Sequence, residues 1–329
     1  MYSLKELIKK KNKDKILFTP GPSSLSEANL INLNPPFGRG DRFYVKTEKR
    51  VLSKIKKISG HKKIVTTQGS GSTVLEMVSL NFLRGNVLII STGYYSDRLY
   101  NLAVFAKKTH NNIKTVNKID WKNINQIKKK FDWIWACYTE TSRGLKLSMD
   151  ELKRLSRRVK SNLAIDATAS FGLEKNHNYA DVVSFSSCKG LLGLTGAGFI
   201  CYNSEPKNKV NSFVLNLSSA REKKMTGPYH AIQSLELIVK NYKNFKKSVI
   251  VNKKRALSKF KNLLVYPKKN QPLLCTYLKC KVKGSSPKVI LYQPRLKLDG
   301  SVICHLGEAH LMDKAKGKIL DHLITDEKK

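Results

Sequence analysis

Short apolar runs alternate with amphipathic segments through the first two thirds of the chain. The runs lie at 87–91, 133–137, 163–166, 182–186 and 198–202. Before and between these runs, apolar residues recur at helical spacing, most clearly at 44–59 and 149–160. Apolar strands separated by amphipathic helices are typical of a mostly parallel sheet with helices on both faces. The pattern therefore predicts an α/β fold.

The pattern changes beyond about residue 220. Helices are predicted at 229–245 and 251–263, followed by short strands around 273–282 and 288–292. This order predicts a smaller α+β domain at the C-terminus. Apolar residues at helical spacing also predict a short helix near the N-terminus. We assign the chain to three parts, which are an N-terminal segment (1–15), a large cofactor-binding domain (16–225) and a small C-terminal domain (226–329).

Polar and reactive side chains follow the predicted strands at the points where these end. Ser70, Tyr95, Thr141, Asp166 and Lys189 all lie at or after such a point. Ligands of open α/β sheets bind at the carboxyl ends of the strands. The spacing therefore predicts one binding cleft at this edge of the sheet.

A Gly/Ser turn at 69–73 joins a strand to a helix. Exposed amides at a helix start, together with nearby hydroxyls, form a phosphate-binding site. Val74 occupies the place of the third glycine of a dinucleotide fingerprint, and no P-loop lysine follows. The turn therefore favours a monophosphate over a nucleotide, and an ordinary strand-to-helix turn is the alternative.

Lys189 follows an apolar strand and lies among Ser, Cys, Gly and Leu residues. A desolvated amine tends to lose its proton, and the neutral amine is a nucleophile toward carbonyls. Asp166 closes another buried strand, where a protonated pyridine nitrogen would satisfy its charge. Each residue alone also has an ordinary explanation, as a solvated lysine among 62 basic residues or an N-cap aspartate. The ordered set predicts a site for pyridoxal phosphate.

These residues lie in motifs that resemble those of the class V aminotransferases, which are fold type I pyridoxal-phosphate enzymes. Within that family, the resemblance is to the alanine–glyoxylate, serine–pyruvate and 2-aminoethylphosphonate–pyruvate transaminase group. It covers about residues 17–228 and rests on Thr19-Pro20-Gly21-Pro22, Gln68-Gly69-Ser70-Gly71-Ser72, Thr92-Gly93-Tyr94-Tyr95-Ser96-Asp97-Arg98, Thr139-Glu140-Thr141-Ser142-Arg143-Gly144, Asp166-Ala167-Thr168-Ala169-Ser170 and Ser187-Cys188-Lys189-Gly190.

The resemblance implies which residues bind the cofactor phosphate. Ser70, Gly71 and Ser72 would bind it within the subunit. Thr226 matches a position that reaches the phosphate from the neighbouring subunit, which implies a homodimer with shared active sites. Cys188 stands where many relatives have a polar phosphate-contacting residue, and Ser187 would also contact the cofactor.

The resemblance also implies roles around the cofactor ring. Tyr95 would stack on one face and Thr168 would touch the other. Thr141 would bond the ring hydroxyl and Asp166 the ring nitrogen. Lys189 would bind the cofactor covalently and then move the substrate's α-proton.

One departure from the family concerns the substrate. Relatives carry an arginine before a late glycine turn, where it binds the substrate's carboxylate or phosphonate, and 301–308 contains none. The substitutes that the sequence offers are Arg39, Arg42, Arg143 and Arg295. The sequence leaves the choice among them open.

The resemblance implies an aminotransferase that moves an amino group from an amino acid or 2-aminoethylphosphonate to a 2-oxo acid such as pyruvate or glyoxylate. A lyase or desulfurase of the same fold is one alternative, because Cys304 lies in the late region. Against it, desulfurase relatives have histidine directly before the lysine, where this chain has Cys188. A non-catalytic, anion-binding homologue is the other alternative.

The charge balance is unusual, with 62 Lys and Arg against 24 Asp and Glu and a formal net charge of +38. Such a charge suits a nucleic-acid or anionic-membrane partner. The basic residues are scattered, however, and most are lysine in a chain also rich in Asn and Ile, as a coding bias would produce. We therefore expect no dedicated nucleic-acid partner.

The sequence offers few signs of targeting or metal binding. It has no run of eighteen apolar residues and no signal-like start, which predicts no membrane span and a cytoplasmic location. Its six cysteines form no CxxC pair and lack zinc-ligand spacing. We therefore expect no metal site.

Overall fold

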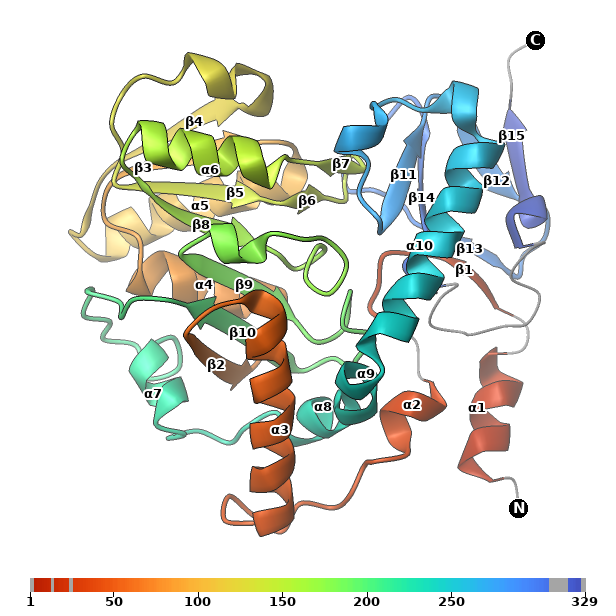
Figure 1. Cartoon of the computed structure of the whole chain (residues 1–329), viewed down its shortest axis with the longest axis horizontal. Helices are drawn as coiled ribbons and strands as arrows, with labels where there is room; N and C mark the ends of the chain where they lie inside the picture. The colour runs from red at the N-terminus through yellow and green to blue at the C-terminus, as the bar shows by residue number, and fades with distance from the viewer. Residues whose placement is uncertain (1–2, 13–14, 24–25, 308–318, 327–329) are drawn as a thin grey trace.

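The computed structural model describes residues 3–12, 15–23, 26–307 and 319–326. Within these residues the centre is a seven-stranded sheet (Figure 1). Its strands lie in the order β2 (Lys63–Gln68), β10 (Ala197–Tyr202), β9 (Val182–Ser186), β8 (Asn162–Asp166), β5 (Trp133–Cys137), β3 (Gly85–Ser91) and β4 (Ile113–Asp120). β10 runs antiparallel to both neighbours, while the remaining pairs are parallel. The predicted mostly parallel sheet is confirmed.

Alternate side chains of β5 reach opposite faces of this sheet, as a period of two requires. Ile134 and Ala136 belong to the core beneath α3 (Arg42–Ser59) and α6 (Met149–Arg158). Trp133, Trp135 and Cys137 belong to the core beneath α4 (Gly71–Asn81) and α5 (Tyr94–Thr109). Helices therefore cover both faces of the sheet, as predicted.

The smaller C-terminal part is built around α10 (Tyr242–Lys259) and short strand pairs (Figure 1). β11 (Cys275–Leu278) pairs with β14 (Ser301–Cys304), β12 (Lys281–Gly284) with β15 (Leu323–Asp326), and β13 (Val289–Leu291) with β1 (Ile16–Phe18). Because β1 comes from the start of the chain, the N-terminal strand packs with the C-terminal part. The boundaries proposed at residues 15 and 225 stay predictions.

The predicted bounds of the C-terminal helices are wrong. In place of helices at 229–245 and 251–263, the structure has α8 (Tyr229–Ser234), α9 (Glu236–Lys240) and the continuous α10. Val249 and Ala256 are buried on α10, so its apolar face continues through residues 246–250, between the two predicted helices. The short strands predicted around 273–282 are β11 and β12, separated by Lys279 and Cys280.

The remaining elements are short. They are α1 (Leu4–Asn12), α2 (Glu27–Leu30), α7 (Leu217–Arg221), β6 (Thr139–Glu140), β7 (Leu145–Lys146) and 3-10 turns at Trp121–Gln126, His177–Tyr179, Lys261–Leu263, Lys268–Asn270 and Ile319–His322. α1 confirms the helix predicted near the N-terminus, although residues 1–2 and 13–14 of that segment lie outside the described residues. No helix in the described ranges is long and apolar enough to cross a membrane.

Candidate active site

Five of the predicted site residues follow strands that end at the same edge of the central sheet. Ser70 comes after β2, Tyr95 after β3, Thr141 after β5 and Lys189 after β9, while Asp166 is the last residue of β8. These five strands point the same way, because only the antiparallel β10 separates β2 from the rest of them. The topology therefore brings the predicted residues to one edge.

The start of α4 forms a compact cradle at this edge. Ser70 caps the helix, its Oγ accepting a hydrogen bond from Thr73 N (3.3 Å), while Thr73 Oγ1 accepts one from Ser70 N (3.1 Å). A Cβ added to Gly71 would lie 3.0 Å from the Thr168 side chain. Glycine thus lets the Thr168 loop pack directly on the helix start, where N–H groups and the helix dipole favour an anion.

Arg98 adds a positive charge to the cradle. Its Nη1 donates a hydrogen bond to Ser72 Oγ (2.8 Å), and its Cζ lies 5.2 Å from the centre of the Tyr95 ring. Arg98 lies within one of the family-like motifs, but no role was predicted for it. The missed signal is its spacing, because residues three and four apart share one face of a helix and Arg98 follows Tyr95 and Tyr94 by those intervals.

Asp166 is buried, and its Oδ1 accepts a hydrogen bond from the backbone N–H of Thr168 (2.8 Å). Burial raises the pKa of the Asp166 carboxyl. The nearby side chain and N–H group of Thr168 and the charges of Arg98 and Lys189 partly offset this effect. A buried carboxylate in this position is stabilised by a cationic partner. The protonated ring nitrogen of pyridoxal phosphate fits that requirement.

Two hydroxyl groups near this edge are buried without a hydrogen-bond partner in the described part of the chain. They are Thr168 Oγ1 and Tyr292 Oη. Tyr292 follows β13 in the C-terminal part, and burial raises its pKa, with a further contribution from nearby Tyr95. Because buried polar groups are normally paired, these two hydroxyls suit a bound polar molecule such as the cofactor. The sequence analysis did not identify Tyr292.

Glu140 anchors the start of α5, which carries Tyr95. Its buried carboxylate accepts hydrogen bonds from the N–H groups of Tyr95 and Ser96 (both 3.1 Å) at the start of α5. It also accepts from the Ser142 N–H (3.2 Å) and from the hydroxyls of Ser142 and Thr92. Burial raises the pKa of Glu140, and these hydrogen bonds oppose that shift. Glu140 thereby fixes the positions of both Tyr95 and the neighbouring Thr141.

The loop after β9 presents Lys189, which is half-buried. The Ser187 hydroxyl donates to Leu194 O inside this loop, and Ser23 N donates to Cys188 O (2.8 Å). A Cβ on Gly21 would lie 3.3 Å from Lys189 Cγ, so the Pro-Gly-Pro segment packs against the lysine. The charge of Lys189 opposes the rise that burial causes in the pKa of Asp166. The two side chains therefore lie close enough to interact electrostatically.

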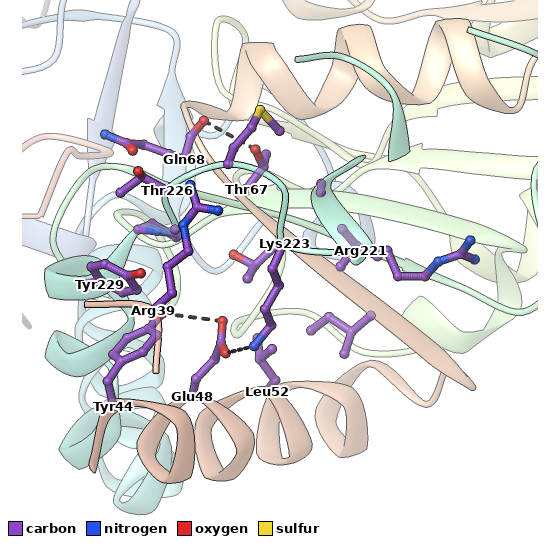
Figure 2. Close-up of a pocket in the computed structure, with 17 residues that line it drawn as sticks. Arg39, Tyr44, Glu48, Leu52, Thr67, Gln68, Arg221, Lys223, Thr226 and Tyr229 are labelled. Atoms are coloured by element: carbon purple, nitrogen blue, oxygen red, sulfur yellow. Dashed lines mark hydrogen bonds and ion pairs between the residues drawn. The ribbon is translucent and has the colours of Figure 1, made fainter. Parts of the chain in front are cut away.

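Thr226 and Arg39 line a cavity of about 110 Å³ between α3 and β2 (Figure 2). Figure 2 shows Arg39 pointing toward Thr226 and Gln68, while Glu48 forms an ion pair with Lys223 on the α3 side of the cavity. Lys189 does not line this cavity. Within one chain, Thr226 therefore lines a cavity that Lys189 does not line.

The other candidate arginines occupy different surroundings. Arg143 is exposed after β6, near Tyr266, whose pKa it helps to lower against the effect of burial. Arg42 is exposed at the start of α3. Arg295, in the loop between β13 and β14, lies over the Tyr94 ring, 5.5 Å from its centre. Among these four arginines, Arg295 is the one that contacts the Tyr94-Tyr95 pair in the described residues.

Comparison with known families and curated proteins gives a consistent result. The family model described as Aminotransferase class-V matches residues 44–227. A bifunctional phosphonoacetaldehyde hydrolase/aminoethylphosphonate transaminase of Clostridioides difficile is 24% identical over 301 residues, covering 80% of this chain and 47% of that protein. A 2-aminoethylphosphonate–pyruvate transaminase of Pseudomonas aeruginosa is 24% identical over 198 residues, covering 56% and 53%. The chain spans about half the length of these curated relatives.

Solved structures share the fold over almost the whole chain. Ureidoglycine–glyoxylate aminotransferase from Bacillus subtilis superposes with a TM-score of 0.76 at 15% identity, covering 94% of this chain and 93% of that one. Alanine–glyoxylate aminotransferase from Nostoc sp. gives 0.73 at 18% identity, covering 93% and 95%. The predicted fold type I architecture is confirmed.

Proposed function

This chain belongs to the class V aminotransferases, and from that premise we propose that it uses pyridoxal phosphate to move an amino group from a small amine to a 2-oxo acid. The donor would be an amino acid or 2-aminoethylphosphonate, and the acceptor pyruvate or glyoxylate. The observation that carries the proposal is the meeting of three parts at one sheet edge. These parts are the Ser70 cradle, the buried Asp166 carboxylate and Lys189.

When bound, pyridoxal phosphate would supply an electron sink for the carbanion at the substrate's α-carbon. Ser70, Gly71 and Ser72 would bind its phosphate, and Asp166 would hold the proton on its ring nitrogen. Lys189 would bind the cofactor covalently and then carry a proton between the substrate's α-carbon and the cofactor's C4′. Tyr95, Thr141, Thr168 and Ser187 would orient the cofactor.

The lyase or desulfurase alternative is less well supported. A desulfurase needs an accessible cysteine thiolate as nucleophile. Cys304 is fully buried in β14, and burial raises its pKa well above the usual value. That environment favours a packing role for Cys304, and hence favours amino transfer.

The function can be tested with purified protein incubated with pyridoxal phosphate and then with a panel of primary amines and amino acids. We expect an amine-driven shift in the cofactor absorbance, reversed by a 2-oxo acid, without release of ammonia or sulfide. Release of either product would support the lyase alternative. Cofactor binding without any amine-driven shift would support a non-catalytic homologue.

We also propose a homodimer with shared active sites. Thr226, which lines a cavity that Lys189 does not line, would reach the cofactor phosphate of the neighbouring subunit. The segment that joins α2 to α3 and the start of α3 expose apolar side chains, namely Ile31, Phe37, Phe43 and Val45. A cluster of this kind suits an interface between copies. A cytoplasmic location stays a prediction.

The variant Phe37→Glu should weaken this dimer at least about tenfold, because a buried phenylalanine contributes roughly 1.5–3 kcal/mol. Phe37 is 86% exposed in the single chain. Sedimentation over a range of concentrations measures the change. Phe105→Glu, at a 49% exposed position on α5, is the matched control and should behave as the wild type. An unchanged dimer in Phe37→Glu would place the interface elsewhere.

A further inference from the structure

We propose that Arg295 binds the anionic group of the substrate amine, in place of the arginine that relatives carry before the late turn. This role of Arg295 rests on the proposed function. The arginine would make the site select small amines that bear a phosphonate or a carboxylate.

Arg295 is held on the aromatic pair at the start of α5. Its Nη1 lies 3.5 Å from Tyr94 Oη, and its Cζ lies 5.5 Å from the centre of that ring. Tyr94 in turn packs edge-to-face on Tyr95, with ring centres 5.3 Å apart. The guanidinium is therefore one ring away from the residue that would stack on the cofactor.

The same loop is anchored at this edge by a second residue. Tyr292, three residues before Arg295, has a buried hydroxyl and interacts with Tyr95. A clamp needs such support, because positioned side chains lose little additional freedom when the ligand binds. The segment 292–295 thus brings a guanidinium from the C-terminal part to the carboxyl edge of the central sheet.

The charge of Arg295 is available to a ligand. The side chain is exposed, and no carboxylate in the described ranges forms an ion pair with it. Arg98 also approaches the Tyr94 ring, with its Cζ 5.7 Å from the centre. Hydrogen bonds from Arg98 and then Arg295 lower the pKa of the Tyr94 hydroxyl. Two guanidinium groups that converge on one ring favour a tetrahedral or planar oxyanion, which guanidinium binds bidentately.

In relatives this turn carries an arginine, whereas the described part of it here, residues 301–307, contains no lysine or arginine. His305 is fully buried in that turn, and its Nε2 lies 2.9 Å from Thr276 Oγ1. Burial, assisted by the charge of Lys253, holds the pKa of His305 well below its usual value. A neutral, buried histidine cannot bind a phosphonate by charge.

The other candidates are less well placed. Arg39 lines the cavity between α3 and β2, which Lys189 does not line. Arg143 is directed toward the surroundings of Tyr266. Arg295 is the candidate held by the aromatic residues of the site.

The test compares charged and uncharged amines in the half-reaction. Wild type, Arg295→Met, Arg295→Lys and the control Arg154→Met, at an exposed position on α6, are loaded with pyridoxal phosphate and mixed with 2-aminoethylphosphonate, β-alanine or propylamine. In Arg295→Met we expect the half-saturating concentration of the two anionic amines to rise about 10- to 100-fold, as for a lost charge-assisted hydrogen bond. Propylamine should be unaffected, and Arg295→Lys should recover part of the loss.

The outcomes separate this inference from the function on which it rests. A wild-type protein that responds to no amine contradicts the proposed function itself. A wild type that responds, paired with an Arg295→Met variant that keeps the preference for anionic amines, overturns the role of Arg295. Cofactor affinity, measured by fluorescence titration, should be unchanged in Arg295→Met. A large loss there would assign Arg295 to the cofactor and would also overturn the inference.

Discussion

Replacing Lys189 by alanine is expected to abolish covalent attachment of pyridoxal phosphate and to lower the rate of amino transfer by about 10²–10⁴-fold, the usual contribution of a positioned acid–base group. The amine performs two tasks in the proposed reaction, because it binds the cofactor and then carries the proton at the substrate's α-carbon. Alanine can perform neither task. The cofactor should still bind through the Ser70 cradle, without the covalent link.

The structure indicates that this loss would be chemical and not structural. The loop of Lys189 is closed by bonds that do not involve its amine, such as Ser23 N to Cys188 O and the Ser187 hydroxyl to Leu194 O. Truncation of the half-buried lysine side chain leaves both in place. The variant should therefore fold as the wild type does.

The measurement is borohydride reduction followed by peptide mass spectrometry, together with the rate of the amine half-reaction. In the wild type, the reduced cofactor should remain on the peptide that contains Lys189. The control is Lys62→Ala, at an exposed lysine before β2, which should keep both the adduct and the rate. An adduct on another lysine, or full activity in Lys189→Ala, would refute the assignment.

The sheet could be predicted well where its strands are buried on both faces. β5 and β9 have the predicted limits because every residue in each is buried, so the apolar run and the strand coincide. β4 went unrecognised because it lies at the edge of the sheet and exposes Lys114, Thr115 and Lys118 among its apolar residues. An edge strand of that composition has no apolar run to detect.

The sequence could predict only those site residues that lie at or just after the end of a predicted strand. Asp166 and Lys189 occupy strand ends, which the sequence pattern locates directly. Tyr292 and Arg295 reach the same edge from the C-terminal part, through the pairing of β13 with β1. No local pattern encodes that approach, since it depends on contacts between residues distant in sequence. Glu140 was missed for the same reason. The backbone N–H groups that it binds, those of Tyr95 and Ser96, lie more than forty residues earlier in the sequence.

Replacing Asp166 by asparagine separates function from stability more sharply than any other change at this site. Asparagine keeps the size of the side chain and can still accept from Thr168 N, but it has no charge for the cofactor's ring nitrogen. The amine half-reaction should slow about 10²–10³-fold, the usual cost of removing one preorganised electrostatic group. Rapid-mixing absorbance of the cofactor measures this rate.

The cofactor-free protein should respond in the opposite sense. Burial raises the folded-state pKa of Asp166 above its usual value, so between the two pKa values the folded state binds a proton that the unfolded state lacks. Stability therefore falls as pH rises through that interval, and at neutral pH the ionised, buried carboxylate is unfavourable. Asp166→Asn removes this cost. Without cofactor, the variant should be at least as stable as the wild type at pH 7 in urea unfolding.

The matched control is Asp181→Asn, because Asp181 accepts a hydrogen bond from Leu163 N (2.8 Å) at the opposite end of the same pair of strands. That change should leave the half-reaction rate near the wild-type value. A wild type more stable than Asp166→Asn without cofactor would mean that Asp166 serves the fold. We expect the Asp166→Asn variant to react more slowly and to be no less stable than the wild type. This result would mean that the Asp166 charge is retained to bind the cofactor, although it lowers the stability of the folded protein.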